Sequence, residues 1–317
     1  MQDQGGQEEA QKPDAARRGA VALIGFGEAA QAFTAGWQSA LPGFAPRAFD
    51  IKTDDPLLRD AKRADYARCG AGGSATLAEA LEGVDAIFSL VTADQANAAA
   101  QAAAACLPAG ALFFDCNSCS PGAKRRSQAA IEGAGGRYVD TAVMAPVHPK
   151  LHRTPLLVAG SHVDEALALL SVLDMQAKPV EGGVGAASAI KMTRSVMIKG
   201  LEALVLECVL TGRANGVEDA VLDSLDASFP GFDWRSRAAY MMERAMTHGI
   251  RRAAEMREVA LTVDEAGLEG RMARATATWQ DEVGGMKLDA AALGTDAARM
   301  ADAILERIGA AVEKKRA

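Results

Sequence analysis

A glycine turn and an acid that follows it have the types and spacing to do chemistry. Residues 25–30 read GFGEAA, a GxGxxA pattern between an apolar run at 20–24 and a helical stretch over 28–40. Gly25 would permit a tight turn, Gly27 would let a pyrophosphate approach the backbone, and Ala30 would let the helix pack closely on the strand. The N–H groups and the positive end of the helix dipole would then hold the phosphates. The residues predicted to contact the cofactor at this turn are Gly25, Phe26, Gly27, Glu28, Ala29 and Ala30.

Asp50 lies 20 residues after Ala30, at the end of a second strand expected over 47–50. A carboxylate at this position can accept hydrogen bonds from the ribose hydroxyls and would repel a 2′-phosphate, which favours NAD. Lys52 is close enough to leave NADP possible. The alternative is a glycine turn in a sheet domain that binds no cofactor.

The order of the elements predicts how these residues are positioned. Strand-like runs alternate with helical stretches up to about residue 180, which is typical of parallel βαβ units with ligands at the carboxyl ends of the strands. We expect an α/β fold, a Rossmann doubly wound and mostly parallel sheet followed by an all-α C-terminal domain. The expected strands cover 20–24, 47–50, 86–91, 111–115, 138–140 and 156–159, and the expected helices cover 28–40, 94–106, 186–211, 217–226, 233–266, 268–282 and 295–313.

A glycine-rich hinge at 181–185 marks the change of pattern. We therefore expect a mobile tail at 1–18, a dinucleotide-binding Rossmann domain at 19–182, and an all-helical substrate and dimerisation domain at 183–317. The long apolar helix over 186–211 is hard to bury within a small helical domain, so it predicts a homodimer.

The composition excludes several classes of function. The net charge of -7 argues against a nucleic-acid partner, and no apolar run reaches the length that spans a membrane. The first 18 residues lack the apolar stretch of a secretory signal. The five cysteines show no disulfide framework, so we expect a soluble, cytoplasmic protein. The CxxC of Cys116 and Cys119 is interpreted as two small residues at a strand end, and no metal site is expected.

Four further segments carry a resemblance when taken in order with the glycine turn. They read DCNSCSP at 115–121, YVDTAVMAP at 138–146, GVGAASAIK at 183–191 and HGIRRAAEM at 248–256. Together they resemble the β-hydroxyacid dehydrogenase family, which includes 3-hydroxyisobutyrate and 6-phosphogluconate dehydrogenases. The last segment looks like a divergent branch with a helical domain of uncharacterised type. The resemblance implies an NAD(P)-dependent oxidoreductase that acts on a small hydroxyacid or a related alcohol or carbonyl.

The resemblance implies that Lys191, near the start of the long helix, is the catalytic acid/base. An amine whose pKa is lowered by burial or by a nearby cation can take the hydroxyl proton while hydride leaves the carbon. Arg194 lies one turn away and Ser195 is on the same helix face, where the family usually has asparagine. Without the other motifs, Lys191 would be interpreted as a solvated surface lysine.

The substrate loop departs from the family. Where Ser-Gly-Gly is usual, this chain has Met144, Ala145 and Pro146, and proline has no N–H with which to hold a carboxylate. His148, Lys150, His152 and Arg153 follow, and some of them could replace the missing donors, or they could form a basic surface loop.

The remaining predicted contacts come from strand ends and from a later helix. Val91, Thr92 and Ser118 are expected to contact the cofactor. The helix spacing places His248, Arg251 and Glu255 on one face, which could close over the substrate as an anion-holding wall or be a salt-bridged surface. The residues predicted to bind substrate are Ser120, Met144, His148, Arg194, Ser195, His248 and Arg251.

Two other functions fit the same pattern. Imine reductases share the fold but usually lack the lysine, so Lys191 counts against that activity. A catalytically silent dinucleotide-binding sensor is the other alternative, and the altered residues 144–146 leave it open.

Overall fold

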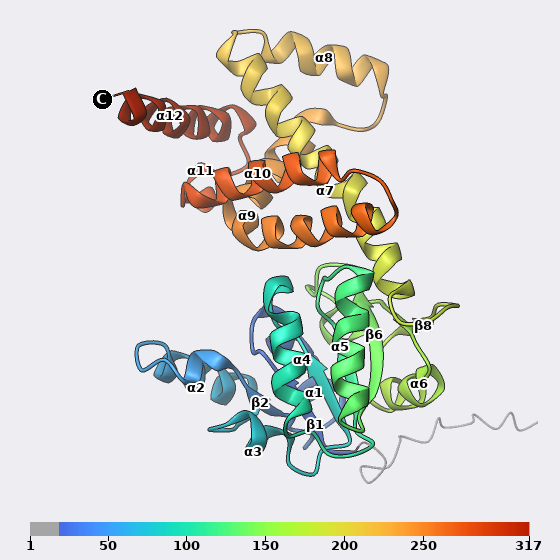
Figure 1. Cartoon of the computed structure of the whole chain (residues 1–317). Coiled ribbons are helices and arrows are strands. Elements are labelled where there is room, and N and C mark those ends of the chain that lie inside the picture. The colour runs from blue at the N-terminus through green and yellow to red at the C-terminus, as the bar shows by residue number, and fades with distance from the viewer. Residues whose placement is uncertain (1–18, 317) are drawn as a thin grey trace, which may run out of the picture. The chain divides into compact units, whose positions relative to one another are not determined.

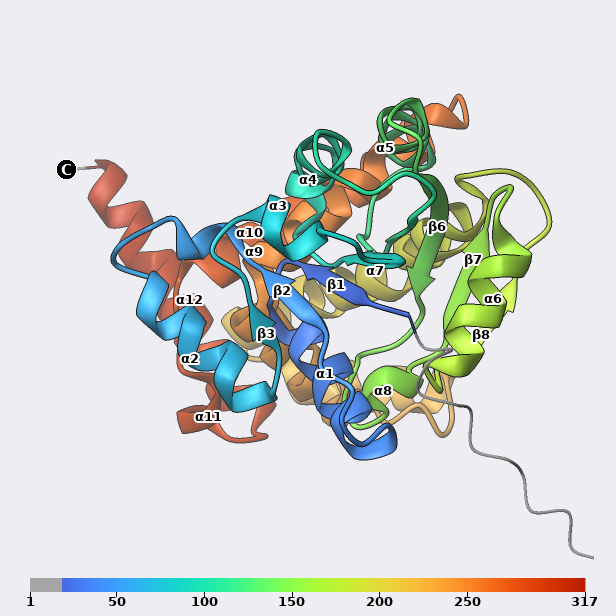
Figure 2. The same ribbon diagram turned by 90° about the horizontal axis from the view of Figure 1, so that it is seen from below.

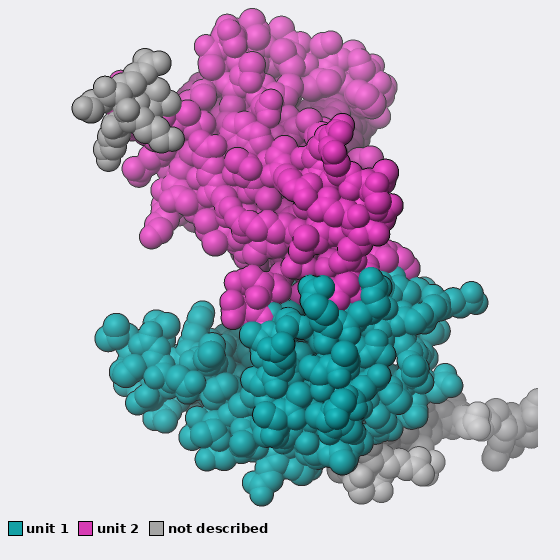
Figure 3. Space-filling model, viewed as in Figure 1, with its two compact units in different colours: residues 1–91, 96–117, 125–187 teal, residues 92–95, 118–124, 188–317 magenta. Residues whose placement is uncertain are grey.

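The computed structural model describes residues 19–316, apart from the side chains of residues 312 and 314–316. The segment 1–18, for which a mobile tail is predicted, lies outside the described residues. The chain forms two compact units (Figure 3). Unit 1 runs to Val91 and continues through Ala96–Asn117 and Arg125–Ala187, and unit 2 comprises Thr92–Gln95, Ser118–Lys124 and the chain from Ser188 onward.

Unit 1 is built on an eight-stranded sheet in the order β3-β2-β1-β4-β5-β6-β7-β8. All neighbouring strands are parallel except β6 and β7, which are antiparallel. The strands are β1 (Val21–Ile24), β2 (Arg47–Phe49), β3 (Gly72–Gly73), β4 (Ala86–Ser89), β5 (Leu112–Asp115), β6 (Arg137–Val143), β7 (Leu156–Ala159) and β8 (Ala177–Pro179). The strand order reverses direction between β1 and β4, which is where ligands bind in sheets of this kind.

Helices cover both faces of the sheet (Figures 1 and 2). One face packs on α1 (Glu28–Ala40), α2 (Arg59–Cys69) and α6 (Val163–Val172). The other face packs on α3 (Leu77–Leu81), α4 (Ala96–Ala104) and α5 (Pro121–Gly133). Short 3-10 turns at Ile51–Thr53, Ala93–Gln95 and Leu151–Arg153 complete the connections. This arrangement confirms the predicted doubly wound, mostly parallel sheet.

Strand periodicity explains the two apolar cores of unit 1. Val21 and Leu23 of β1 lie in the core with α1, whereas Ala22 and Ile24 lie in the core on the opposite face. Successive side chains of a strand alternate between faces, so a strand buried on both sides must be apolar throughout. This requirement made the central strands recognisable in the sequence.

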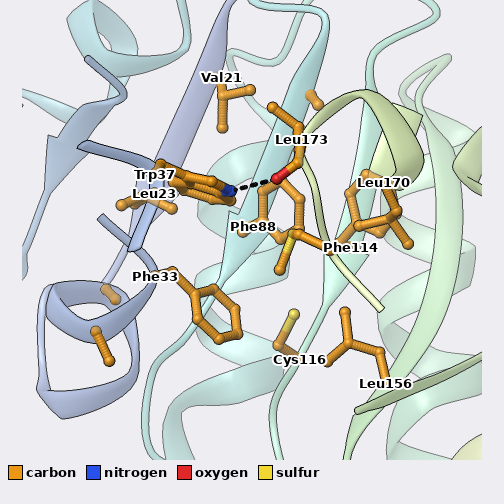
Figure 4. Close-up of a cluster of buried hydrophobic side chains, with 14 of the residues drawn as sticks. Val21, Leu23, Phe33, Trp37, Phe88, Phe114, Cys116, Leu156, Leu170 and Leu173 are labelled. Atoms are coloured by element: carbon orange, nitrogen blue, oxygen red, sulfur yellow. Dashed lines mark hydrogen bonds between the residues drawn. The ribbon is translucent and has the colours of Figure 1, made fainter. Parts of the chain in front are cut away.

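Trp37 of α1 is the largest side chain in the core between the sheet and α1. It is fully buried, lies against Phe33 and Phe88, and its Nε1 donates to the carbonyl oxygen of Leu173, 3.0 Å away (Figure 4). Because Leu173 ends α6, this hydrogen bond ties α6 to the face that α1 covers. The indole therefore adds a polar anchor to apolar packing.

Unit 2 contains the all-helical second part of the chain, as predicted. Its helices are α7 (Ala186–Ala214, of which the last residues of unit 1 form the start), α8 (Glu218–Ser228), α9 (Trp234–Glu265), α10 (Arg271–Gly285), α11 (Ala290–Leu293) and α12 (Ala297–Arg316). Helices α9 and α10 approach closely at Gly249, where an added Cβ would lie 2.3 Å from the carbonyl oxygen of Gln280. Glycine is therefore required at this crossing. No described helix is long and apolar enough to cross a membrane.

Two leucines of unit 1 give a test of this core. Leu170 of α6 is fully buried in the cluster of Figure 4, whereas the Leu57 side chain is 91% exposed. Leu170→Ala should lower the free energy of unfolding by about 2–5 kcal/mol, because it leaves a cavity. Leu57→Ala removes the same atoms from the surface and should change the free energy of unfolding by less than about 0.5 kcal/mol. Equal effects of the two substitutions in calorimetry would contradict the packing described.

Candidate active site

The glycine turn lies where the ends of three strands meet. Gly25 follows β1 with φ of +82°, and its N–H donates to the carbonyl oxygen of Phe49 at the end of β2, 2.8 Å away. A Cβ at Gly25 would lie 2.8 Å from Cγ1 of Val91 and 2.9 Å from the carbonyl oxygen of Leu90, both just after β4. Only glycine combines this φ with such close approach. The turn therefore lies at the switch point between β1 and β4.

The space beside Gly27 fits a phosphate group. A Cβ on Gly27 would meet no described atom within 4 Å, so the backbone is open to a ligand. Helix α1 begins at Glu28, and its N-cap residue, Gly27, has no side chain with which to cap the first turn. An uncapped helix N-terminus beside an open glycine is the usual cradle for a pyrophosphate. Ala30 is fully buried, as expected for close packing of α1 on the sheet.

Asp50 supports the turn from the end of β2. Its Oδ2 accepts from the Phe26 N–H at 2.8 Å, and its Oδ1 accepts from the Lys52 N–H at 3.0 Å. Lys62 of α2 donates to the carbonyl oxygen of Phe26 at 2.9 Å. Each carboxylate oxygen keeps a further acceptor position, so Asp50 can hold the turn and still accept from a ribose hydroxyl.

A buried polar network lies at the carboxyl ends of β4 and β5. Asn117 Nδ2 donates to Ser89 Oγ at 2.9 Å and to Asp115 Oδ1 at 2.8 Å. The Tyr138 hydroxyl donates to Asp115 Oδ2 at 2.6 Å. Such a network fixes the strand ends from which the next loop residues leave the sheet.

Lys191 and Ser118 meet within unit 2, although 73 positions separate them in the chain. Lys191 Nζ donates to Ser118 Oγ at 2.7 Å, and both side chains are partly buried. Ser118 is the residue directly after Asn117, so the lysine reaches the loop that leaves the end of β5. Sequence motifs predicted each residue separately, and the structure places them in direct contact.

A charged cluster surrounds this lysine between α7 and α9. Glu255 forms ion pairs with Lys199 and, at 3.2 Å, with Arg251. Burial would raise the pKa of Glu255, but the charges of Lys199, Lys191 and Arg251 outweigh it and lower that pKa to about 2. Burial lowers the pKa of Lys199 despite its pairing with Glu255. Lys191 therefore lies near the ionised carboxylate of Glu255.

Three predicted substrate residues lie on α7 or on the loop that carries Ser118, and two of them have other hydrogen-bond partners. Arg194 is exposed. Ser195 is buried, and its hydroxyl donates to the carbonyl oxygen of Lys191 at 2.9 Å, one turn back on the same helix. Ser120 is fully buried, and its Oγ accepts from the Ala123 N–H at 3.3 Å, which caps α5. Their roles in substrate binding stay predictions.

A cavity of about 620 Å³ in unit 2 brings together other predicted residues. Its walls include Thr92, His248 and Arg251, together with Asp94 and Glu258. Thr92 belongs to the loop after β4. His248 and Arg251 come from one face of α9, as the helix spacing predicted. Glu255 pairs with Arg251 on the same face, as the spacing predicted, and also with Lys199 of α7, but it is not among the residues that line the cavity. The cavity can hold a small polar molecule.

Two carboxylates of α9 were not anticipated from the sequence. Glu258 Oε2 accepts from the Ser120 N–H at 2.8 Å, and Glu265 Oε2 accepts from the Gly122 N–H at 2.8 Å. They are seven residues apart, and that spacing places both on one helix face. The spacing was visible in the sequence, but their partners are more than a hundred positions away.

The predicted substrate loop of unit 1 lies after β6. The Met144 N–H donates to the carbonyl oxygen of Pro155 at 2.9 Å, and His148 is exposed. His152 Nε2 lies 3.2 Å from Asp174 Oδ2, and Arg153 Nε donates to the same oxygen at 2.9 Å. These two side chains contact Asp174, and a role in place of the missing donors stays a prediction. No group of three or more potential metal ligands occurs in the described part of the chain.

Comparison with known families identifies both parts of the chain. Residues 57–185 match the NAD binding domain of 6-phosphogluconate dehydrogenase, so the match starts after the glycine turn. Residues 213–283 match a domain of unknown function, DUF1932. No curated protein matches the chain.

Solved structures extend the comparison to the whole fold. A conserved hypothetical protein from Sinorhizobium meliloti 1021 is 36% identical, with 90% of this chain and 96% of that chain covered and a TM-score of 0.67. A 3-hydroxyisobutyrate dehydrogenase from Mycobacterium tuberculosis, in a structure with L-serine, is 16% identical over 91% of this chain and 98% of that chain, with a TM-score of 0.66. An imine reductase from Aspergillus terreus, in complex with NADPH4 and dibenz[c,e]azepine, is 18% identical over 80% of this chain and 89% of that chain, with a TM-score of 0.53.

The last two likenesses show the fold alone, whereas the first is close enough to show common family membership. The match of residues 57–185 assigns an NAD-binding domain to unit 1, consistent with NAD or NADP as cofactor. The chain thus belongs to one family with the Sinorhizobium meliloti protein. It joins an NAD-binding domain to a DUF1932 helical domain, a combination that fits a divergent member of the β-hydroxyacid dehydrogenase family.

Proposed function

We propose that this protein transfers a hydride between NAD(P) and a small hydroxyacid, or a related alcohol or carbonyl compound, with Lys191 as the general acid/base. The hydrogen bond from Lys191 Nζ to Ser118 Oγ carries the proposal. It ties the amine to the loop that directly follows a strand end of the NAD-binding sheet. General acids and bases must be held within hydrogen-bond reach of the reacting group, and this contact holds the amine in place.

When bound, the nicotinamide supplies the carbon that accepts or gives the hydride. The chain supplies the remaining functions. Gly27 and the first turn of α1 would hold the pyrophosphate, and Asp50 would accept from a ribose hydroxyl. Lys191 would take the proton of the substrate hydroxyl during oxidation and return it during carbonyl reduction. Ser118 would orient the amine, and the cations around Glu255 would balance charge as that proton moves.

The choice of NAD over NADP rests on Asp50. Asp50 is 8% exposed, and its carboxylate accepts from the Phe26 N–H of the turn, so the carboxylate would face the ribose. A 2′-phosphate placed there would be repelled. Lys52 at the same strand end is exposed and would offset part of this repulsion, so NADP remains the second candidate.

Imine reduction is the second candidate activity, because an imine reductase shares the fold. Lys191 favours the alcohol or carbonyl reaction, since imine reductases of this fold usually lack the lysine. A sensor that binds the dinucleotide without turnover would need no acid/base at all.

We further propose that the chain is a homodimer through its helical unit. On α7, the side chains of Met197 and Leu204 are 70% and 53% exposed, and Ile198 is also exposed. Exposed apolar side chains along one long helix are typical of a subunit interface.

The proposed acid/base is tested by Lys191→Ala. The variant should lose about 10²- to 10⁴-fold in kcat, because proton transfer by a positioned side chain contributes that much. Affinity for NADH and NADPH, measured by fluorescence titration, should stay the same. Turnover is followed by nicotinamide absorbance on a panel of small hydroxyacids, L-serine, sugar acids, aromatic alcohols and cyclic imines.

The matched control is Lys178→Ala, which removes an exposed lysine of unit 1 and should keep wild-type kcat. Undiminished turnover in Lys191→Ala would exclude the lysine from the chemistry. Dinucleotide binding without turnover of any compound, in wild type and variant alike, would favour a sensor.

The preference for NAD is tested by Asp50→Asn. Removing the negative charge should improve NADPH binding relative to NADH by on the order of tenfold, since a fixed charge then no longer repels the 2′-phosphate. The ratio of the two dissociation constants is the measurement. Asp60→Asn, an exposed carboxylate on α2, is the control and should leave the ratio unchanged. An unaltered ratio in Asp50→Asn would remove Asp50 from cofactor selection.

The dimer is tested by size-exclusion chromatography with light scattering. We expect a dimer for the wild type and a monomer for the double variant Met197→Glu and Leu204→Glu, because buried charges without partners destabilise an interface. Leu268→Glu changes a side chain of unit 2 that is 67% exposed and should leave the dimer intact. A monomeric wild type would contradict the proposal.

A further inference from the structure

Helix α9 lies entirely within the DUF1932 domain and contacts the loop that carries Ser118. The backbone N–H of Ser120 donates to Glu258 of α9, and that of Gly122 donates to Glu265 one heptad further along. Glu258 is partly buried, whereas Glu265 is exposed. The first of these contacts is therefore the better shielded from water and the stronger anchor.

The two carboxylates complete the N-terminus of α5. Ser120 Oγ accepts from the Ala123 N–H, and the Ser120 carbonyl oxygen accepts from the Lys124 N–H at 3.0 Å. With Glu258 on the Ser120 N–H and Glu265 on the Gly122 N–H, the amides around the helix start are satisfied. A negative charge at a helix N-terminus is also stabilised by the helix dipole. The loop is thus held both by its own capping residue, Ser120, and by the two carboxylates of α9.

The position of Ser118 depends on this anchoring. Ser118 lies two residues before Ser120, and Cys119 between them donates from Sγ to the carbonyl oxygen of Ala93 at 3.4 Å. The hydroxyl that accepts from Lys191 therefore lies two residues before the backbone amide that Glu258 holds. Movement of that amide by even a fraction of an ångström would alter the hydrogen bond between Ser118 and Lys191.

We infer that Glu258 is a positioning residue, which acts through the Ser120 amide and Ser118 to hold the Lys191 amine in its working geometry, with Glu265 as a second anchor. The inference deepens the proposed function, because it explains how the helical domain takes part in acid/base chemistry. Glu258 also lines the cavity beside His248 and Arg251. In this account its carboxylate is occupied by the loop amide and touches neither cofactor nor reacting atoms.

The test measures the Lys191 amine directly and needs no substrate. The folded protein is methylated with formaldehyde and cyanoborohydride, and the rate at Lys191 is followed by mass spectrometry of its peptide, with Lys178 as the internal reference. Ser118→Ala removes the acceptor and should raise the rate at Lys191 roughly two- to tenfold, as expected for one lost hydrogen bond. Glu258→Ala should raise it within the same range.

Two further variants separate positioning from general destabilisation. In Ser118→Ala combined with Glu258→Ala the rate should rise no further than in either single variant, because both act on one contact. Glu258→Gln keeps an acceptor for the Ser120 N–H and should give a rate between Glu258→Ala and wild type. Glu243→Ala removes a carboxylate of α9 that accepts from Thr247 of the same helix, and it should leave the rate unchanged.

Each outcome decides the inference. An unchanged Lys191 rate in Glu258→Ala and Glu258→Gln, with a raised rate in Ser118→Ala, overturns it, as does an additive double variant. If the wild type turns over a substrate, Glu258→Ala should lower kcat while the dissociation constant for NADH stays the same. If the methylation pattern holds but no compound is turned over, the positioning stands and the proposed oxidation fails.

Discussion

The hydrogen bond between Lys191 and Ser118 is the contact on which the account of this molecule depends. It joins a helix of the C-terminal part of the chain to the residue that directly follows a strand end of the NAD-binding sheet. The buried network of Ser89, Asp115 and Asn117 fixes that strand end, and the carboxylate of Glu258 fixes the loop beyond it. A single amine is thus held by groups that lie far apart in the sequence.

The sheet and its glycine turn follow from local patterns. The central strands are buried on both faces and so must be continuous apolar runs, and the GxGxxA turn has a physical requirement at each glycine. Their detection needed no long-range information. The short strand β3 consists of Gly72 and Gly73, and β8 is an edge strand that ends in Pro179, so neither carries an apolar signal. Helix α2 is rich in charged residues, so its weak apolar pattern was not recognised either.

The candidate site was only partly predictable from the sequence, because many of its contacts join residues that are far apart in the chain. Motif order identified Lys191 and Ser118, because both stand beside recognisable turns. It did not predict that Ser195 bonds to its own helix or that Ser120 caps α5, since a hydroxyl finds its partner only in the folded backbone. Glu258 and Glu265 carried a helical spacing but no sign of their partners. His152 and Arg153 were ambiguous until Asp174 was placed beside them.

The most direct test of the central claim is a crystal structure of the protein with NAD(P)⁺ and a turned-over substrate or its product. The account predicts a diphosphate against Gly27 and the start of α1, with the Lys191 amine within hydrogen-bond reach of the substrate oxygen. A diphosphate bound elsewhere, or an amine of Lys191 pointing into bulk solvent while the nicotinamide site is filled, would contradict it.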